Sequence, residues 1–206
     1  MSMSDALGCS PKVARERRSR DNYFTPEDCV WPFIEAEREH LSKGRIWEPF
    51  CGDGAIVMPL RASGFDVHAN DIRDVGCPDS EVANCFEYED APARKIVTNP
   101  AYGSRCIPRL IEHALRWHCD YVALFIDMGY FGADRANLLW QRCEPTGRYD
   151  LTWRPDWTGE GASPMKMSWV VWDAKRKGQF WKLLNRIDPP EIVEQRRMPL
   201  FDLTEI

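Results

Sequence analysis

The sequence predicts an α/β fold with a mostly parallel sheet of seven strands, and three features of the chain indicate it. A short apolar run leads into a turn that contains Gly52 and Gly54, and an amphipathic segment follows. A second β-prone run over 95–98 ends in the Asn-Pro-Ala-Tyr segment 99–102. Beyond Arg148 the apolar period shifts toward two, which is typical of antiparallel strands. We therefore expect helices on both faces of the sheet and an antiparallel hairpin near the carboxyl terminus.

The individual elements follow from local patterns along the chain. Thr25 and Asp28 form a predicted capping box at the start of a helix over 27–42. Pro59 should weaken the helix after the glycine turn, and the continuous apolar run over 121–126 predicts a buried central strand. We expect strands at 45–49, 65–70, 81–83, 95–98, 121–126, 149–153 and 167–172, and further helices at 54–63, 104–118, 133–142 and 178–186.

Length and composition indicate one domain in a reducing compartment. The chain has 206 residues, enough for one substantial α/β domain. We expect a flexible basic arm over 1–20, a single domain over 21–187 and an extended tail over 188–206. No membrane span and no secretory signal are visible, so a cytoplasmic protein is expected. Eight cysteines without a Cys-x-x-Cys pair argue against a zinc ribbon, and four scattered histidines predict no metal site.

The charge pattern limits how this chain would bind a nucleic acid. Its formal net charge is −5, so such binding would need a local basic patch. The segment 12–20 carries five basic residues against Glu16 alone, and 175–177 is a second basic run. A solvated basic face explains either segment equally well when it is taken alone.

The glycine turn has the features of a loop that binds S-adenosylmethionine. Gly52 and Gly54 let the backbone pass close to a ligand, and Glu48 precedes them where it can meet a cationic amino group. Asp71 follows Gly52 by the spacing at which an acidic side chain binds ribose hydroxyls. Short glycine loops are common, so this pattern alone leaves the ligand open. The candidates to hold the adenine are Ile72, Asn84 and Phe86.

The segment 99–102 has the features of a loop that activates an amine. An amino nitrogen on a purine or an amide is a poor nucleophile because its lone pair is delocalised. The side-chain oxygen of Asn99 and the carbonyl of Pro100 can accept its two N–H bonds and return the lone pair to nitrogen. Tyr102 offers a flat face for a planar substrate. Alone, the segment would be an ordinary turn, but its position after the glycine loop favours a substrate loop.

Together these residues resemble the amino-methyltransferases that modify the N6 of adenine in DNA. The glycine motif precedes the Asn-Pro-Ala-Tyr segment 99–102, and a Tyr-x-Thr-Pro segment over 23–26 leads both. This order is similar to that of the gamma class, and the size is similar to that of small phage-encoded enzymes. The resemblance covers about 21–173 and implies a Rossmann-like class I methyltransferase fold. It also implies methyl transfer from S-adenosylmethionine to adenine in DNA.

The resemblance assigns roles to individual positions. Asn99, Pro100 and Tyr102 would receive the target base, and a second aromatic residue from the late hairpin would stack on it. Trp157 is our choice for that residue and Trp153 is the second candidate, and a place in the core is the alternative interpretation of both. The implied cofactor residues are Tyr23, Phe24, Thr25, Glu48, Phe50, Cys51, Gly52, Gly54, Asp71, Ile72, Asn84 and Phe86.

The chain departs from this family in three respects. Ala101 replaces the usual second proline, and Asn84 replaces a usual Asp whose register Cys85 could hold instead. There is also no separate target-recognition domain, so the choice of target would fall to 128–145, to 154–165 and to the basic arm. The base would have to leave the duplex to reach such a pocket.

Other functions remain open at the level of sequence. The same loops fit a methyltransferase for RNA adenine or for a protein glutamine amide, or an inactive nucleic-acid-binding relative. The tail segment Arg197–Phe201 is similar to the peptides that dock on bacterial sliding clamps, although their usual first glutamine is absent. The simpler interpretation is that Leu200 and Phe201 pack on the chain's own domain.

Overall fold

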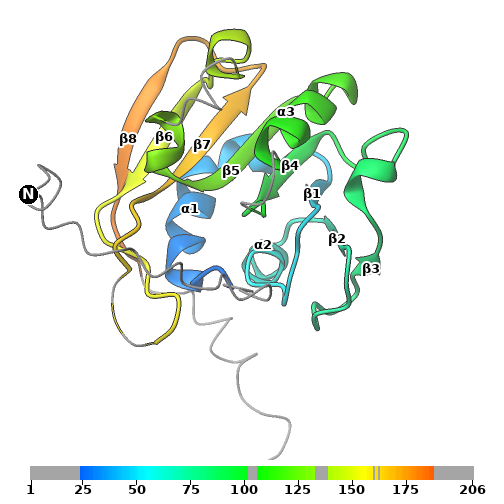
Figure 1. Ribbon diagram of the computed structural model, residues 1–206, viewed down its shortest axis with the longest axis horizontal. Helices are drawn as coiled ribbons and strands as arrows, with labels where there is room; N and C mark the ends of the chain where they lie inside the picture. The colour runs from blue at the N-terminus through cyan, green and yellow to red at the C-terminus, as the bar shows by residue number, and fades with distance from the viewer. Residues whose placement is uncertain (1–23, 102–105, 133–138, 160, 162, 188–206) are drawn as a thin grey trace, which may run out of the picture.

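An eight-stranded sheet in the order β3-β2-β1-β4-β5-β7-β6-β8 organises the molecule (Figure 1). The structure is a computed structural model, and it describes residues 24–101, 106–132, 139–159, 161 and 163–187. The strands are β1 (Ile46–Glu48), β2 (Val67–Asp71), β3 (Glu81–Val82), β4 (Lys95–Thr98), β5 (Tyr121–Asp127), β6 (Gly147–Leu151), β7 (Met167–Asp173) and β8 (Phe180–Leu184).

The sheet is mostly parallel. β1 pairs in parallel with β2 and β4, and β4 pairs in parallel with β5. β7 runs antiparallel to both β5 and β6, which confirms the predicted hairpin near the carboxyl terminus. Consequently the carboxyl ends of β1, β2, β4 and β5 all lie at one edge of the sheet, where α/β folds bind ligands.

Helices cover both faces of the sheet, as the sequence predicts (Figure 1). The α-helices are α1 (Trp31–Leu41), α2 (Val57–Ala62) and α3 (Cys106–Arg116). β5 shows the two faces most clearly because its side chains alternate. Tyr121, Ala123 and Phe125 join the core beneath α1 and α2, whereas the intervening residues join the core beneath α3. Short 3₁₀ turns lie at η1 (Glu27–Cys29), η2 (Cys85–Glu87) and η3 (Met128–Gly132).

The last element of the described chain is a strand, so the predicted helix over 178–186 is wrong, and the described sheet has one strand more than predicted. Residues 180–184 form β8 and pair in parallel with β6. These residues give no clear alternation of buried and exposed side chains, because Trp181 and Leu183 are apolar but exposed and only Leu184 is buried. Sheet pairing therefore overrides the local helical preference at this edge.

The entry to α1 also differs from the prediction. The described residues show Pro26 as the N-cap of η1 with no side-chain cap bond, so the capping box of Thr25 and Asp28 is not formed. η1 ends at Cys29, and α1 begins at Trp31 with Pro32 in its first turn, where a proline is tolerated. The hydroxyl of Thr25 is thus left for another partner.

A buried polar cluster fixes α1 to the sheet. Glu37 on α1 is fully buried and accepts hydrogen bonds from Tyr121 (3.0 Å) and Tyr149. Arg176, which follows β7, forms an ion pair with the same carboxylate at 2.6 Å. A buried carboxylate needs such partners to offset its lost hydration. The cluster sets the position of α1 and, with it, of the segment that precedes α1.

The other predicted elements either match the structure or lie outside the residues that it describes. β4 has the predicted bounds, and Gly64 (φ +88°) follows α2 as predicted. Pro59 lies in the first turn of α2, so it does not interrupt the helix. Within 133–142, residues 139–142 are helical. The basic arm, the tail and its clamp-like segment lie outside the described residues.

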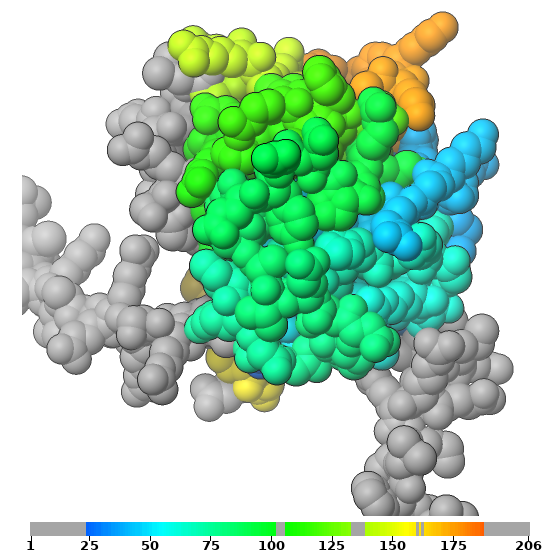
Figure 2. All heavy atoms as spheres, turned by 90° about the vertical axis from the view of Figure 1, so that its right-hand side faces the viewer, coloured from blue at the N-terminus to red at the C-terminus, as the bar shows by residue number. Residues whose placement is uncertain are grey.

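The side of the molecule next to β3 is covered by the segments that lie between α2 and α3 in the sequence (Figure 2). Figure 2 shows this face covered mainly by the cyan and green atoms of the segments from α2 to α3. The seven cysteines within the described ranges are free thiols. Over the same ranges, no helix combines the length and the hydrophobicity that crossing a membrane requires.

Candidate functional site

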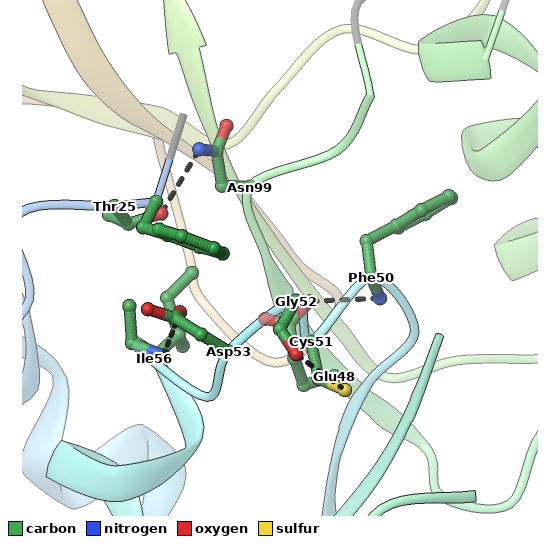
Figure 3. A pocket seen from close by; sticks show the side chains of 10 residues that line it. Thr25, Glu48, Phe50, Cys51, Gly52, Asp53, Ile56 and Asn99 are labelled. Atoms are coloured by element: carbon green, nitrogen blue, oxygen red, sulfur yellow. Dashed lines mark hydrogen bonds between the residues drawn. The ribbon is translucent and has the colours of Figure 1, made fainter. Parts of the chain in front are cut away.

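The loops after β1 and β4 meet at one pocket, because the two strands pair in parallel with Trp47 opposite Ile96. The segment before η1 closes a third side of this pocket (Figure 3). Residues from all three segments line it: Phe24, Thr25, Glu48, Phe50, Cys51, Gly52, Asp53, Ala55, Ile56 and Asn99.

Two glycines shape the loop after β1. Gly52 (φ +51°) and Gly54 (φ +94°) both adopt left-handed backbone conformations, which other residues reach only at a cost. A Cβ at Gly54 would lie 3.1 Å from the Sγ atom of Cys77. The backbone N–H of Gly52 donates to Asp71 Oδ2 at 3.1 Å, so the end of β2 holds the loop in place.

Glu48 places a carboxylate oxygen without a partner at the base of the pocket. Its Oε1 accepts hydrogen bonds from the N–H of Phe50 (3.0 Å) and from the hydroxyl of Thr98. Its Oε2 is buried and has no hydrogen-bond partner among the described residues. Burial raises the pKa of Glu48 well above its usual value, against these two hydrogen bonds. The site therefore favours a ligand that brings a positive charge or an N–H donor to Oε2.

Asn99 presents a second acceptor without a partner. Its Nδ2 donates to the hydroxyl of Thr25 at 3.0 Å, as Figure 3 shows. Its Oδ1 is buried and makes no hydrogen bond within the described part of the chain. Because Thr98 also bonds Glu48, the loop after β4 is tied both to the glycine loop and to the segment before η1. The site thus combines two unpaired acceptors from neighbouring strands.

The predicted adenosine residues lie beside the pocket and not in its lining. Asp71 bonds the glycine loop, and the side chain of Ile72 next to it is 65% exposed. The rings of Phe50 and Phe86 meet edge to face at 6.1 Å. Asn84 accepts a hydrogen bond from the N–H of Phe86 at 3.2 Å, so its oxygen is engaged in closing η2. The paired rings of Phe50 and Phe86 offer an apolar surface to which a flat heterocycle is suited, and Ile72 follows Asp71 as an exposed apolar side chain.

Sequence reasoning found seven of the ten lining residues as candidates and missed three, Asp53, Ala55 and Ile56. Asp53 stands between the two glycines, which was a usable signal. Its Oδ1 accepts a hydrogen bond from the N–H of Ala55 at 3.1 Å, and burial raises its pKa. Tyr23 and Tyr102, both predicted site residues, lie outside the described residues.

The two tryptophans proposed to stack on a substrate pack against the core. The ring of Trp157 lies 6.1 Å from Phe125 and is half-buried. Trp153 packs against the same core, and Arg186 lies over its ring at 5.3 Å. Both contacts are of the kind that a core residue makes, so a stacking role for either tryptophan stays a prediction.

Known structures share this fold, whereas no protein-family model and no curated protein matches the sequence. A Listeria monocytogenes protein assigned to the class I S-adenosylmethionine-dependent methyltransferases aligns over 86% of this chain and 71% of its own, with TM-score 0.55 and 16% identity. The modification subunit of an assigned type I restriction enzyme from Vibrio vulnificus aligns over 82% of this chain and 48% of its own, with TM-score 0.54 and 12% identity.

A third similar structure is a protein from Pyrococcus horikoshii assigned as an RNA methyltransferase. It aligns over 73% of this chain and 85% of its own, with TM-score 0.55 and 10% identity. With the strand order and the two helical faces, these likenesses define a Rossmann-like class I methyltransferase fold. The predicted fold class is therefore confirmed.

Proposed function

We propose that this protein transfers a methyl group from S-adenosylmethionine to the exocyclic N6 amine of adenine in DNA. The observation that carries the proposal is the pair of buried acceptors, Glu48 Oε2 and Asn99 Oδ1, in one pocket at the carboxyl edge of the sheet. Each acceptor fits one of the two reactants.

The glycine loop side fits the cofactor. Glu48 Oε2 would accept a hydrogen bond from the cationic amino group of S-adenosylmethionine. Gly52 and Gly54 carry no side chain and would leave room for the methionine part of the cofactor. The paired rings of Phe50 and Phe86, with the exposed Ile72, would take the adenine ring. When bound, this cofactor supplies an electrophilic methyl group on sulfur.

The Asn99 side fits the amine that receives the methyl group. Asn99 Oδ1 and the carbonyl of Pro100 would accept the two N–H bonds of the amine and so concentrate its lone pair on nitrogen. The nitrogen would then accept the methyl group as the bond between that carbon and sulfur breaks, and its extra proton would leave to solvent. Such a reaction depends on alignment of the two reactants, which proximity in one pocket provides.

DNA is the substrate that we favour among three. The family resemblance of the 23–26, 48–54 and 99–102 segments is to DNA adenine enzymes, and the Vibrio structure is a modification subunit of a restriction enzyme. The Pyrococcus structure makes RNA the second candidate. A protein glutamine amide has the same N–H geometry and is the third.

The test is methyl transfer from labelled S-adenosylmethionine to unmethylated DNA, RNA and a protein extract in parallel, followed by nucleoside analysis. We expect N6-methyladenine in DNA, and a loss of at least a hundredfold in rate for Asn99→Ala with cofactor affinity retained. Asn185→Ala, which changes an exposed asparagine, is the matched control and should keep wild-type activity. Label in RNA or protein would replace the substrate, and no label on any of the three would overturn the proposal.

A further inference from the structure

The hydroxyl of Thr25 forms a hydrogen bond with the side chain of Asn99, which lies 74 residues away in the sequence. Thr25 is 7% exposed, and its Oγ1 accepts the 3.0 Å hydrogen bond from Asn99 Nδ2. Because η1 is capped at Pro26 without a side-chain bond in the described chain, this hydroxyl does not serve the helix that it precedes. Its position inside the pocket lining points to a role at the site.

A carboxamide has two unlike ends, and the difference matters at this position. A threonine hydroxyl can donate as well as accept, so the bond to Thr25 fixes the position of the Asn99 side chain, and the observed orientation, with Nδ2 on Thr25, is the one that leaves the oxygen for a ligand N–H. With Nδ2 bound by Thr25, Oδ1 points away from the hydroxyl (Figure 3). That oxygen is the buried acceptor without a partner in the described chain, so it is ready to accept from a ligand.

We propose that Thr25 is a positioning residue that holds the Asn99 amide with Oδ1 free to accept an N–H of the substrate amine. The inference rests on the proposed function, since it takes Asn99 as the acceptor for that amine. It differs from the role implied by the resemblance, in which Thr25 is one of the residues that hold the cofactor. The two roles predict different kinetics.

Thr25→Val removes the hydroxyl at nearly constant shape, and Thr25→Ser keeps it. We expect Thr25→Val to lower kcat by about tenfold to a hundredfold, as misplacement of a reacting group does. Thr25→Ser should stay within about threefold of wild type, and both variants should bind S-adenosylmethionine within about threefold of wild type by calorimetry. Thr152→Val is the matched control, because Thr152 forms an exposed hydrogen bond with Asn185 (3.1 Å), and it should leave kcat unchanged.

A double variant tests whether Thr25 acts through Asn99. In an Asn99→Ala background, Thr25→Val should cause no further loss of kcat, because its partner is already absent. An added loss as large as that of the single variant would overturn the inference. So would a Thr25→Val protein that loses cofactor affinity by the same factor as kcat/KM, since Thr25 would then be a cofactor ligand.

One measurement needs no substrate and so separates this inference from the proposed function. The side-chain amide protons of Asn99 can be assigned by NMR from their absence in Asn99→Ala, and the bonded proton should exchange slowly with water. Thr25→Val should speed that exchange at least tenfold, while Thr25→Ser and Thr152→Val should not. Unchanged exchange in Thr25→Val, in a protein with wild-type thermal stability, would overturn the inference even if methyl transfer to DNA is found.

Discussion

At the scale of single residues, two buried acceptors stand out: Glu48 Oε2 and Asn99 Oδ1 lack partners in the described chain. A buried polar atom left unpaired costs about 1–3 kcal/mol, so two in one pocket are expensive for the free protein. A ligand that donates to both would recover this free energy on binding. We therefore relate the two unpaired acceptors to ligand binding and not to the stability of the fold.

The raised pKa of Glu48 predicts a pH dependence for cofactor binding. Burial disfavours the charged form of Glu48 and so raises its pKa. In the free protein this carboxyl group therefore keeps its proton to a pH well above the ordinary pKa of a glutamate. A cationic ligand favours the ionised form, so binding should release a proton and should strengthen as pH rises through this window. Calorimetry in buffers of different ionisation enthalpy measures the release.

The sign for stability is opposite to the sign for binding. In the same pH window the unfolded chain binds fewer protons than the free protein, so the free energy of unfolding should fall as pH rises. Glu48→Gln should abolish both the proton release and this part of the pH dependence. Glu35→Gln, which changes an exposed residue of α1, is the control and should alter neither. Proton release that survives in Glu48→Gln would assign it to another group.

Gly54→Ala should impair binding more than its cost in stability suggests. The left-handed backbone at position 54 costs an alanine about 1–2 kcal/mol, and the new Cβ would press on Cys77 Sγ at 3.1 Å. We expect cofactor affinity to fall at least tenfold because the loop must move. Gly44→Ala has a similar backbone (φ +83°) but open space, so it should lose comparable stability and keep the affinity. Equal affinities in the two variants would contradict a binding role for the loop.

Sequence patterns identified the acceptor residues but not their partners. Glu48 and Asn99 were recognisable because each follows a β-prone run and begins a recognisable motif. The bond between Thr25 and Asn99 joins residues that lie 74 positions apart in the sequence, and no local pattern encodes it. The capping-box prediction failed for the same reason, since a tertiary partner took the hydroxyl that local rules assign to the helix.

At the scale of elements, prediction succeeded where period and burial agreed. β5 is a continuous apolar run, β4 is a short β-prone run whose four residues are all buried, and the bounds of both strands were predicted to within a residue. The prediction for β8 failed because Trp181 and Leu183 are exposed at the sheet edge, so the apolar residues of this strand do not identify a buried face. Only its pairing with β6 makes it a strand, and that contact spans about thirty residues of sequence.

Gly147→Ala should detach β8 from β6. A Cβ at this position would lie 2.3 Å from the ring of Phe180 and 2.5 Å from its carbonyl oxygen, which is too close for any side chain. Phe180 also packs on Tyr149 at 4.9 Å, so its ring cannot simply turn away without losing that contact. We expect a loss of about 1–3 kcal/mol in the free energy of unfolding, as overpacking gives.

Urea denaturation measures this loss, and amide hydrogen exchange locates it. The amides of 180–184 should lose protection in Gly147→Ala, while those of β4 and β5 keep theirs. Gly132→Ala is the matched control, because nothing lies within 4 Å of the corresponding Cβ position. Unchanged stability and protection in Gly147→Ala would show that β8 contributes little to the sheet.

At the scale of the whole molecule, the position of charge relative to the pocket decides how DNA could approach. The basic run 175–177 follows β7, whose end pairs with the start of β5, so it lies at the edge opposite the pocket. Arg176 in this run is also committed to Glu37. The segment 12–20 instead precedes Phe24, which lines the pocket, so the chain itself ties these five basic residues to the site.

We therefore expect the arm to supply most of the electrostatic attraction for DNA. Each phosphate that a basic residue neutralises contributes about 0.9 to the slope of log K against log salt concentration. Deletion of residues 1–20 should reduce that slope by up to about 4.5, since the arm carries five basic residues in 12–20. A fluorescence titration of duplex DNA at several salt concentrations measures it.

Deletion of 188–206 is the control, because that segment carries more acidic than basic residues and should leave the slope unchanged. The arm deletion should raise KM for DNA and leave kcat at saturating DNA nearly intact, because Asn99 and Glu48 remain in place. If the slope is unchanged without the arm, phosphates are bound by another surface. The segments 154–165 and 128–145 would then be the next to vary, since the choice of target was predicted to fall to them.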